Sequence, residues 1–257
     1  MKRDRRFALL LVLPAVACAP VDGGDDAAGT GQPDAGGQQA ICTMPNTPLP
    51  CEDQNILQLS LHDFVSSGAV DNSESGGVFT STIDARAGGM SEAPQNPFVY
   101  AKFTETGLVK VELDDETALG SMDWDLMARR FVVLLNGGDI GPSCVGAAPV
   151  AGGFDDLVAP PDGAGYGVED TFGEPDACAL QTDTRYTLGD PRALLMDWWT
   201  YDTCVATSGQ VFALRLADGR FVKLVIDAYY GSGQEACNTG GTAGTNAAVL
   251  TLRWAWL

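Results

Sequence analysis

The sequence predicts an all-β fold: one antiparallel, twisted β-sandwich-like domain. Apolar and polar side chains alternate over residues 248–257, the pattern of a strand with one buried face. Asp218-Gly219 separates two apolar runs, 211–217 and 220–227, and predicts a hairpin closed by a type I′ turn. The chain contains no convincing long amphipathic helix pattern. Alternating runs joined by turn residues are typical of antiparallel sheets.

Residues 1–18 read as an export signal. Four basic residues lie among the first six, and the apolar run Phe7–Val16 that follows is too short to span a bilayer. Ala15-Val16-Ala17-Cys18 resembles the lipobox of bacterial lipoproteins, although Ala15 stands where Leu is commoner. We therefore expect Cys18 to carry the lipid, and an ordinary Ala-x-Ala cleavage is the alternative.

Residues 19–40 are expected to form a disordered tether. They contain no Leu, Ile, Phe, Trp or Tyr and are rich in Gly, Asp, Ala and Gln. Such a segment buries too little apolar surface to offset its ordering entropy. As a Gly-rich coil it spans on the order of 25 Å, enough to hold a domain clear of a membrane. Ala19 directly after Cys18 resembles the sorting signal for the outer membrane or cell surface of a Gram-negative bacterium.

Residues 41–257 are predicted to be one β domain. The chain has 34 acidic and 15 basic residues, a net charge of −19. This charge argues against nucleic acid as a partner and against electrostatic binding to anionic lipid. Solubility in an extracellular or salty setting is sufficient to explain the negative charge.

Six cysteines remain after Cys18. An even number in an exported chain indicates three disulfides, and six cysteines allow fifteen sets of pairs. Two of them, Cys42 and Cys51, flank a Pro-rich loop and are expected to pair locally. The candidates are Cys42, Cys51, Cys144, Cys178, Cys204 and Cys237. The chain has no CxxC motif and one histidine, which makes a zinc site of ordinary spacing improbable.

The elements of the first half can be placed in order. Leu57, Leu59 and Leu61 alternate with polar residues and predict a strand, with His62 on its polar, exposed side. Residues 66–77 are expected to be a polar loop. Residues 98–103 and 108–113 predict two short strands joined by a turn at 104–107.

Residues 121–138 predict a central strand buried on both faces. An apolar run at Phe131–Leu135 ends at Asn136-Gly137-Gly138, a turn signal. Near the start of this stretch, Asp123 and Asp125 would lie on the same strand face. Such a carboxylate pair is sterically compatible with acid–base chemistry, but acids around a strand-start Trp are more often solvated or hydrogen-bonded caps.

Residues 139–197 form the least regular region, rich in Gly, Pro and Asp. An irregular region this long within a domain is usually functional or crosslinked. It ends in a cluster of large side chains, Met196, Trp198, Trp199 and Tyr201. These predict either a core-facing strand end or the wall of a pocket for a flat apolar ligand.

The residue inventory argues against an enzyme. A Ser–His–Asp or Cys–His arrangement would have to use His62, and no GxSxG elbow is present. No Walker loop is present, and the glycines of 163–167 lack dinucleotide-site spacing.

Several segments resemble, in order, the HmuY family of haem-binding surface lipoproteins. They are MDWDLMARRFVVLLNGG (122–138), PPDG (160–163), WWTY (198–201), the hairpin from 211 to Tyr230, and LTLRW (250–254). The resemblance covers about residues 55–256. It implies a mostly antiparallel β fold, an outer-membrane lipid anchor on Cys18, and haem capture for iron uptake through a partner outer-membrane receptor.

The chain departs from the family at the haem ligands. The resemblance places two axial histidines near 176–181 and 201–204, where this chain has Cys178 and Cys204 instead. Met196 is then a candidate thioether ligand to haem iron. The same comparison suggests that Cys178 and Cys204 pair with each other and seal the site.

Two functions follow. The first is haem capture at the pocket formed by Met196, Trp198, Trp199 and Tyr201. The alternative is a HmuY-fold structural or protein-interaction module that has lost its axial haem ligands.

Overall fold

The computed structural model describes residues 42, 45–46, 48–173, 177–183 and 190–257. The predicted signal and tether, with Cys18, lie outside these residues. Gln39–Leu257 forms one compact unit, and its described part is dominated by antiparallel sheets, as the sequence predicts. No helix among the described residues has the length and apolar content needed to cross a bilayer.

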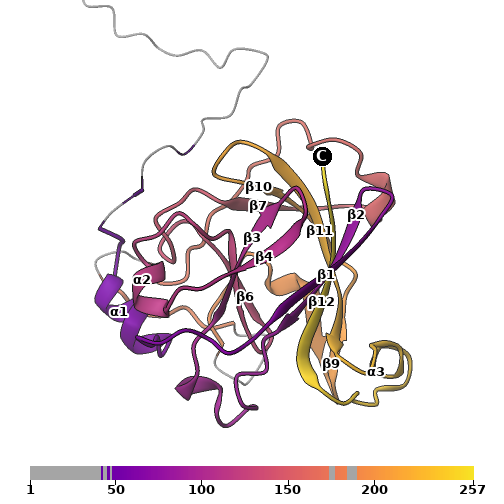
Figure 1. Ribbon diagram of the computed structural model, residues 1–257, viewed down its shortest axis with the longest axis horizontal. Helices are drawn as coiled ribbons and strands as arrows, with labels where there is room; N and C mark the ends of the chain where they lie inside the picture. Colours follow the sequence, from indigo (N-terminus) through magenta and orange to yellow (C-terminus); the bar gives the residue numbers. More distant parts are fainter. Residues whose placement is uncertain (1–41, 43–44, 47, 174–176, 184–189) are drawn as a thin grey trace, which may run out of the picture. The chain divides into compact units, whose positions relative to one another are not determined.

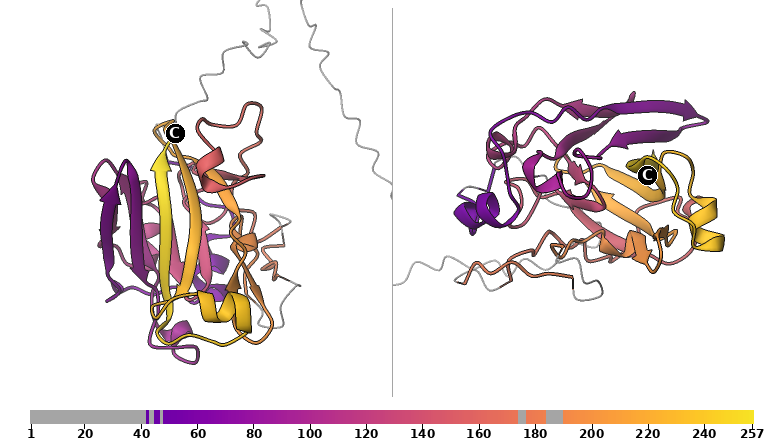
Figure 2. Two further views of the ribbon diagram at one scale, coloured as in Figure 1. Left: turned by 90° about the vertical axis from the view of Figure 1, so that its right-hand side faces the viewer. Right: turned by 90° about the horizontal axis from the view of Figure 1, so that it is seen from below.

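A six-stranded sheet forms one layer of the domain (Figure 1). Its order along the sheet is β1 (Val70–Ser75), β2 (Val78–Asp84), β12 (Ala247–Trp256), β11 (Phe221–Tyr230), β10 (Val211–Arg215) and β7 (Gly146–Val150). The order can be followed in the left view of Figure 2, from the purple strands β1 and β2 through yellow β12 to gold β11. The last strand of the chain therefore lies inside the sheet, between strands from opposite ends of the sequence.

A four-stranded sheet packs against it, and a two-stranded ribbon, which is not part of either ladder, packs against β11. The four strands are β4 (Gly107–Val111), β3 (Val99–Thr104), β5 (Leu126–Arg129) and β6 (Val132–Leu135). The ribbon pairs β8 (Trp199–Tyr201) with β9 (Val205–Thr207). The described short helices are α1 (Glu52–Gln58), α2 (Asp115–Ala118), α3 (Glu235–Gly240) and the 3-10 turns η1 (Ala93–Gln95), η2 (Phe154–Asp156) and η3 (Met196–Trp198).

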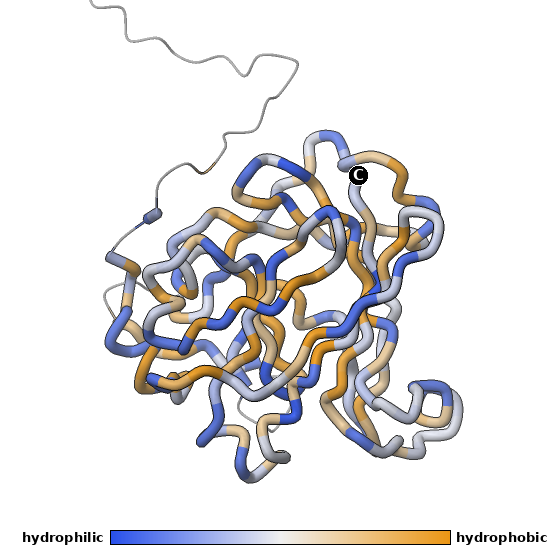
Figure 3. The backbone as a smooth tube through the Cα atoms, viewed as in Figure 1, coloured by the Kyte–Doolittle hydropathy of each residue, from blue (hydrophilic) through white to orange (hydrophobic). Residues whose placement is uncertain are grey.

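The main core fills the space between the two larger sheets, and Trp254 on β12 is at its centre. Its side chain is fully buried, stacks on Phe79 at 4.3 Å between ring centroids, and meets Phe103 of the other sheet edge-on at 4.9 Å. The indole N–H donates to the Ser81 hydroxyl at 2.8 Å, which satisfies the one polar atom of the ring. Figure 3 shows hydrophobic stretches along inner strands and hydrophilic residues at many loops.

The strand pairs predicted at 98–113 and 211–227 are confirmed, and so is the last strand. The turn between β10 and β11 differs from the prediction. Gly219 has φ +85 and donates to the Leu216 carbonyl, whereas Asp218 does not have a positive φ. The loop is therefore the three-residue hairpin loop, closed by a glycine in the left-handed region, and not a two-residue type I′ turn.

The strand predicted at Leu57–Leu61 is wrong. Residues 52–58 form helix α1, which begins after Cys51, and the Cys51 carbonyl accepts from the N–H groups of Gln54 and Asn55. Leu57 is 70% exposed while Leu59 is buried beyond the helix end. Three leucines at alternate positions span too few residues to distinguish a strand from a helix.

The polar loop predicted at 66–77 contains strand β1. Five of its six residues are exposed, since β1 is an edge strand, and so no apolar alternation marks it. Gly76 and Gly77 both have positive φ and form the two-residue turn into β2. Likewise, the described part of the irregular region 139–197 contains the strand β7, at the opposite edge of the same sheet.

The single central strand predicted at 121–138 is a hairpin. Arg129 pairs with Val132, so Arg130 and Phe131 form a two-residue turn between β5 and β6. Arg130 adopts φ +57, a conformation that two-residue hairpins usually give to Gly or Asn. The Asn-Gly-Gly turn after β6 is present, and Gly138 (φ +65) lies against the Glu169 backbone, where a Cβ would have no room.

Candidate ligand-binding groove

The predicted aromatic wall lies mostly in the core. The 3-10 turn Met196–Trp198 leads directly into β8, and the Trp198 indole N–H donates to the Phe131 carbonyl at 3.2 Å. Trp198 and Trp199 are 1% and 4% exposed, whereas Tyr201 is 49% exposed. The two indoles thus support the β5–β6 hairpin, and the tyrosine alone faces solvent.

The space beside these indoles is small. A cavity of about 10 Å³ is lined by Met196, Trp198 and Trp199 together with residues of the β5–β6 hairpin. That is about the volume of a single water-sized probe. This cavity is far too small for haem.

A larger groove adjoins this cavity, with a volume of about 390 Å³. This is within the range of small-molecule sites. We call it the methionine groove, after Met90. Its lining residues include Met90, Pro94, Phe98, Arg129, Arg130, Phe131, Val132, Leu180, Asp190 and Pro191. Four of these also line the small cavity: Phe131, Val132, Asp190 and Pro191. Met196 and Met90 thus border two adjoining spaces that share one wall.

Met90 supplies a soft donor at this groove, and it is not among the residues predicted from the sequence. Its side chain is 54% exposed. Met90 lies in a turn that is held at both ends, because the Gly89 N–H donates to the Arg86 carbonyl and the Ala93 N–H to the Gly89 carbonyl. A single methionine in a polar loop carries no pattern, so only the fold reveals its position.

Two charged side chains of the groove, Arg129 and Asp190, differ in how many hydrogen bonds they make. The Arg129 guanidinium donates to the carbonyls of Leu59, Ser60 and Asn96 and lies over the Phe98 ring at 4.1 Å. Its burial lowers its pKa. By contrast, Asp190 has a buried carboxylate oxygen, Oδ2, with no hydrogen-bond partner among the described residues. Burial, and then the nearby Asp183, raise the Asp190 pKa to about 6.

The structure describes two disulfides where the sequence predicts three, since Cys42 and Cys144 form none, and both predicted pairings are wrong. Cys51 is joined to Cys178, not to Cys42, and Cys204 is joined to Cys237, not to Cys178. The first bond ties the irregular region to α1. Around it, the Gln58 side chain donates to the Cys178 carbonyl at 2.9 Å and accepts from the Leu180 N–H at 3.1 Å.

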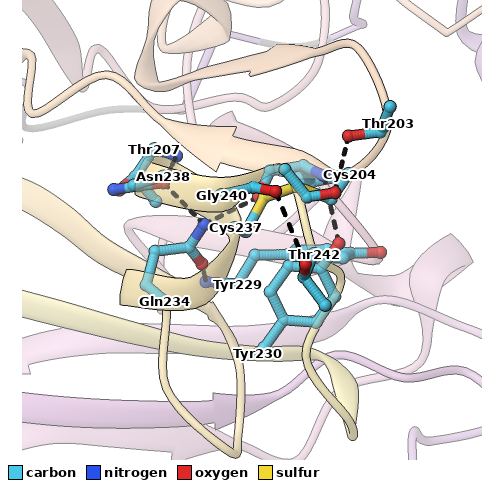
Figure 4. The surroundings of a disulfide bond; sticks show 12 residues. Thr203, Cys204, Thr207, Tyr229, Tyr230, Gln234, Cys237, Asn238, Gly240 and Thr242 are labelled. Atoms are coloured by element: carbon cyan, nitrogen blue, oxygen red, sulfur yellow. Dashed lines mark hydrogen bonds between the residues drawn. A yellow bond between two sulfur atoms is a disulfide. The ribbon is translucent and has the colours of Figure 1, made fainter.

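The second disulfide joins the β8–β9 ribbon to α3 (Figure 4). Gln234, the residue directly before α3, supports it by donating to the Val205 carbonyl and accepting from the Tyr229 N–H, each at 2.8 Å. The Tyr230 hydroxyl accepts from the Val205 N–H at 3.0 Å. The two cysteines that the family resemblance placed at the haem ligands therefore lie in separate crosslinks.

The predicted carboxylate pair does not form. Asp123 and Asp125 precede β5 and are not on one strand face: Asp123 is exposed, whereas Asp125 is 4% exposed and accepts from the Phe103 N–H at 2.8 Å. Burial raises the Asp125 pKa to about 6. Asp125 is thus a buried backbone acceptor that joins the start of β5 to β3.

His62 has a structural contact as well. Its ring Nε2 lies 3.0 Å from the Pro94 carbonyl oxygen, and the ring is 5.1 Å from the Phe64 ring. Within the described ranges, no group of three or more His, Cys, Asp or Glu side chains is arranged to hold a metal ion.

Neither protein-family models nor curated proteins give a match to the chain. Solved structures do. A protein from Bacteroides vulgatus ATCC 8482, described as HmuY-like and haem-binding, is 18% identical, with 75% of this chain and 97% of that chain covered and a TM-score of 0.42. A protein from Bacteroides fragilis NCTC 9343, described by name only as a lipoprotein, is 17% identical over 75% and 96% of the two chains, with a TM-score of 0.44.

A third structure, the apo form of a HmuY analogue from Tannerella forsythia, is 13% identical over 73% and 96% of the two chains, with a TM-score of 0.38. Two of these three proteins carry the family name that the sequence motifs resemble. Both the identities and the TM-scores are low, so we base the function on the residues of this chain.

Proposed function

We propose that this protein is a surface-anchored binding protein that captures haem in the methionine groove. The observation that carries the proposal is the Met90 side chain, 54% exposed at a groove of about 390 Å³ with aromatic and aliphatic walls. A thioether is an established axial ligand of haem iron. The function is binding, with no catalytic step.

The residues of the groove fit a flat apolar ligand. Phe98, Phe131 and Pro191 supply the apolar walls, and Met90 supplies the sulfur donor. Haem would supply an iron centre that takes the thioether. Met196, behind the shared wall, is the second sulfur candidate, as the sequence analysis proposed.

Anchoring and partner choice belong to the same proposal. A lipid on Cys18 would hold the domain at the outer membrane or cell surface, and a haem receptor in that membrane would take the cargo. Metabolic labelling with a radioactive fatty acid tests the anchor: label should be incorporated into the wild type and be absent from a Cys18→Ala variant.

The test of the site is a haem titration of the purified full chain, followed by absorbance in the oxidised and reduced states. We expect saturable one-to-one binding whose Soret band changes in Met90→Ala. Met122→Ala is the matched control, because Met122 is half-buried and does not line the groove. Binding that is unchanged in Met90→Ala and lost in Met196→Ala would move the site to the aromatic segment.

The alternative function is a protein-interaction module of the same fold without haem. It is favoured by one observation, the packed space of about 10 Å³ beside Trp198 and Trp199. Weak, non-saturating partition of haem, equal in the wild type and in Met90→Ala, would support this alternative.

A further inference from the structure

A second space, larger than the methionine groove, is a cleft of about 700 Å³ that shares one lining residue, Arg130, with that groove. We call it the arginine cleft. Its walls come from 64–68, from the turn 84–89, from Asn96-Pro97, and from Arg130 and Ala247. It is thus a separate space on another side of the β5–β6 turn.

The backbone at Arg130 does not need an arginine. The residue is first in a two-residue hairpin turn with φ +57, where Gly is preferred and a side chain adds steric strain. The one backbone hydrogen bond from its N–H goes to the Ala85 carbonyl at 2.8 Å, which any residue except proline can make. A strained residue of this kind indicates that its side chain has a use.

The charge of Arg130 lacks a counter-ion. The residue is 8% exposed, and Nη1 donates to the carbonyls of Arg86 and Ala247 at 3.4 and 3.2 Å. The buried Nε has no partner, and no carboxylate of the described residues is within ion-pair distance of the guanidinium. The nearest ring is that of Tyr229, with its centroid 5.8 Å away. Burying a cation away from water costs free energy, and a bound anion would offset part of that cost.

The other charged side chains near the cleft already have partners, so Arg130 is the cation left to bind a ligand. Asp84 and Arg86 neutralise each other through two hydrogen bonds of 2.7 and 2.6 Å. Arg129 is saturated by backbone carbonyls. Asp190 carries the opposite charge, but it lines the methionine groove and not this cleft. An anion entering the cleft therefore meets one unpaired guanidinium.

The other wall residues of the cleft indicate which kind of group the rest of the ligand would carry. Phe64 and Val65 are 47% and 42% exposed, and as neighbours in the sequence they give the cleft an apolar wall that a ligand can reach. From these walls and the guanidinium we propose that the arginine cleft binds an amphipathic carboxylate, with its acid group on Arg130 and its apolar part against Phe64 and Val65. This site goes beyond the haem proposal and does not depend on it.

The probe is 4-phenylbutyrate, and its neutral analogue 4-phenylbutan-1-ol is the ligand control. Both are titrated into the full chain while the Gly88 and Gly89 amide signals, at the cleft wall, are followed by NMR. We expect saturable binding of the acid and at least about tenfold weaker binding of the alcohol, because a charge-assisted hydrogen bond is lost. Equal affinity for the two, or no binding of the acid, overturns the proposal.

Arg130→Gly is the protein variant, since glycine takes φ +57 without strain. It should keep or raise the thermal midpoint and weaken the acid at least about tenfold, leaving the alcohol unchanged. Arg253→Gln is the matched control, since it removes the same charge from a residue outside the cleft. If Arg130→Gly binds the acid as the wild type does, Arg130 is not the anchor. The acid–alcohol comparison on the wild type decides the proposal even where a variant fails to fold.

Discussion

Removing the Cys204–Cys237 disulfide should cost the protein a large part of its stability. The two cysteines are 33 positions apart, and closing such a loop removes about 12 cal/mol/K of entropy from the unfolded chain. At 25 °C this corresponds to about 4 kcal/mol, against a total of about 5–15 kcal/mol for a typical domain. The hydrogen bonds of Gln234 to Val205 and Tyr229 do not involve the sulfurs and should persist, so the loss is expected to be mainly this term.

The assay is urea unfolding of the wild type and of the double variant Cys204→Ala/Cys237→Ala, followed by tryptophan fluorescence. Cys51→Ala/Cys178→Ala is the comparison, because its bond joins residues 127 positions apart and the same relation gives about 5 kcal/mol. We expect both variants to unfold at much lower urea. A loss below about 1 kcal/mol in the first variant would contradict the loop-entropy reasoning and indicate an unfolded state that is already compact.

Three further predictions concern buried groups. Burial raises the Glu169 pKa to about 8 against opposing hydrogen bonds from the N–H groups of Leu135 and Leu194. The contribution of Glu169 to the free energy of unfolding should therefore be largest below about pH 4.5. It should fall as pH rises towards 8, by a few kcal/mol at most (up to about 1.4 kcal/mol per pH unit). A Glu169→Gln variant with the wild-type pH slope in urea titrations would refute this. Burial also raises the Cys144 pKa to about 11, beside the Cys42 thiol that is hydrogen-bonded to it. Oxidised glutathione should convert this pair into a third disulfide, which peptide mapping would show, and a crosslink to any other cysteine would contradict the placement. Finally, Gly138→Ala should destabilise the protein by more than about 2 kcal/mol, because φ is +65 and the new Cβ would overlap the Glu169 carbonyl. A thermal midpoint equal to that of wild type would show that the turn can move.

The parts of the fold that the sequence predicts are those with a local signal. The Asp218-Gly219 turn and the alternation in β12 are visible along the chain, and both elements are present. The turn at Arg130 was missed because a charged residue occupies a position where the pattern expects Gly or Asn, so the chain reads as one long strand. Strand β1 was missed because an edge strand needs no apolar face.

The site depends on contacts between distant residues, which a single sequence does not encode locally. Cys178 bonds to Cys51 across 127 positions, and no spacing rule selects this pair among fifteen sets. Met90 reaches the groove only because its turn packs beside the β5–β6 hairpin. The two tryptophans are recognisable in the sequence as a cluster. Their burial depends on Phe131, which is far away in the sequence and whose carbonyl accepts a hydrogen bond from the Trp198 indole.

The position of β12 has a consequence for the order of assembly during synthesis. This strand pairs with β2 on one side and β11 on the other, so it joins the first hairpin of the domain to the rest of the larger sheet. Of the strands of this sheet, β12 is synthesised last. Until it is available the β1–β2 hairpin has no further partner strand in its sheet, and the buried Trp254 is missing from the core. The larger sheet is therefore completed only when β12 is available, and a variant that lacks residues 247–256 should leave that hairpin unpaired.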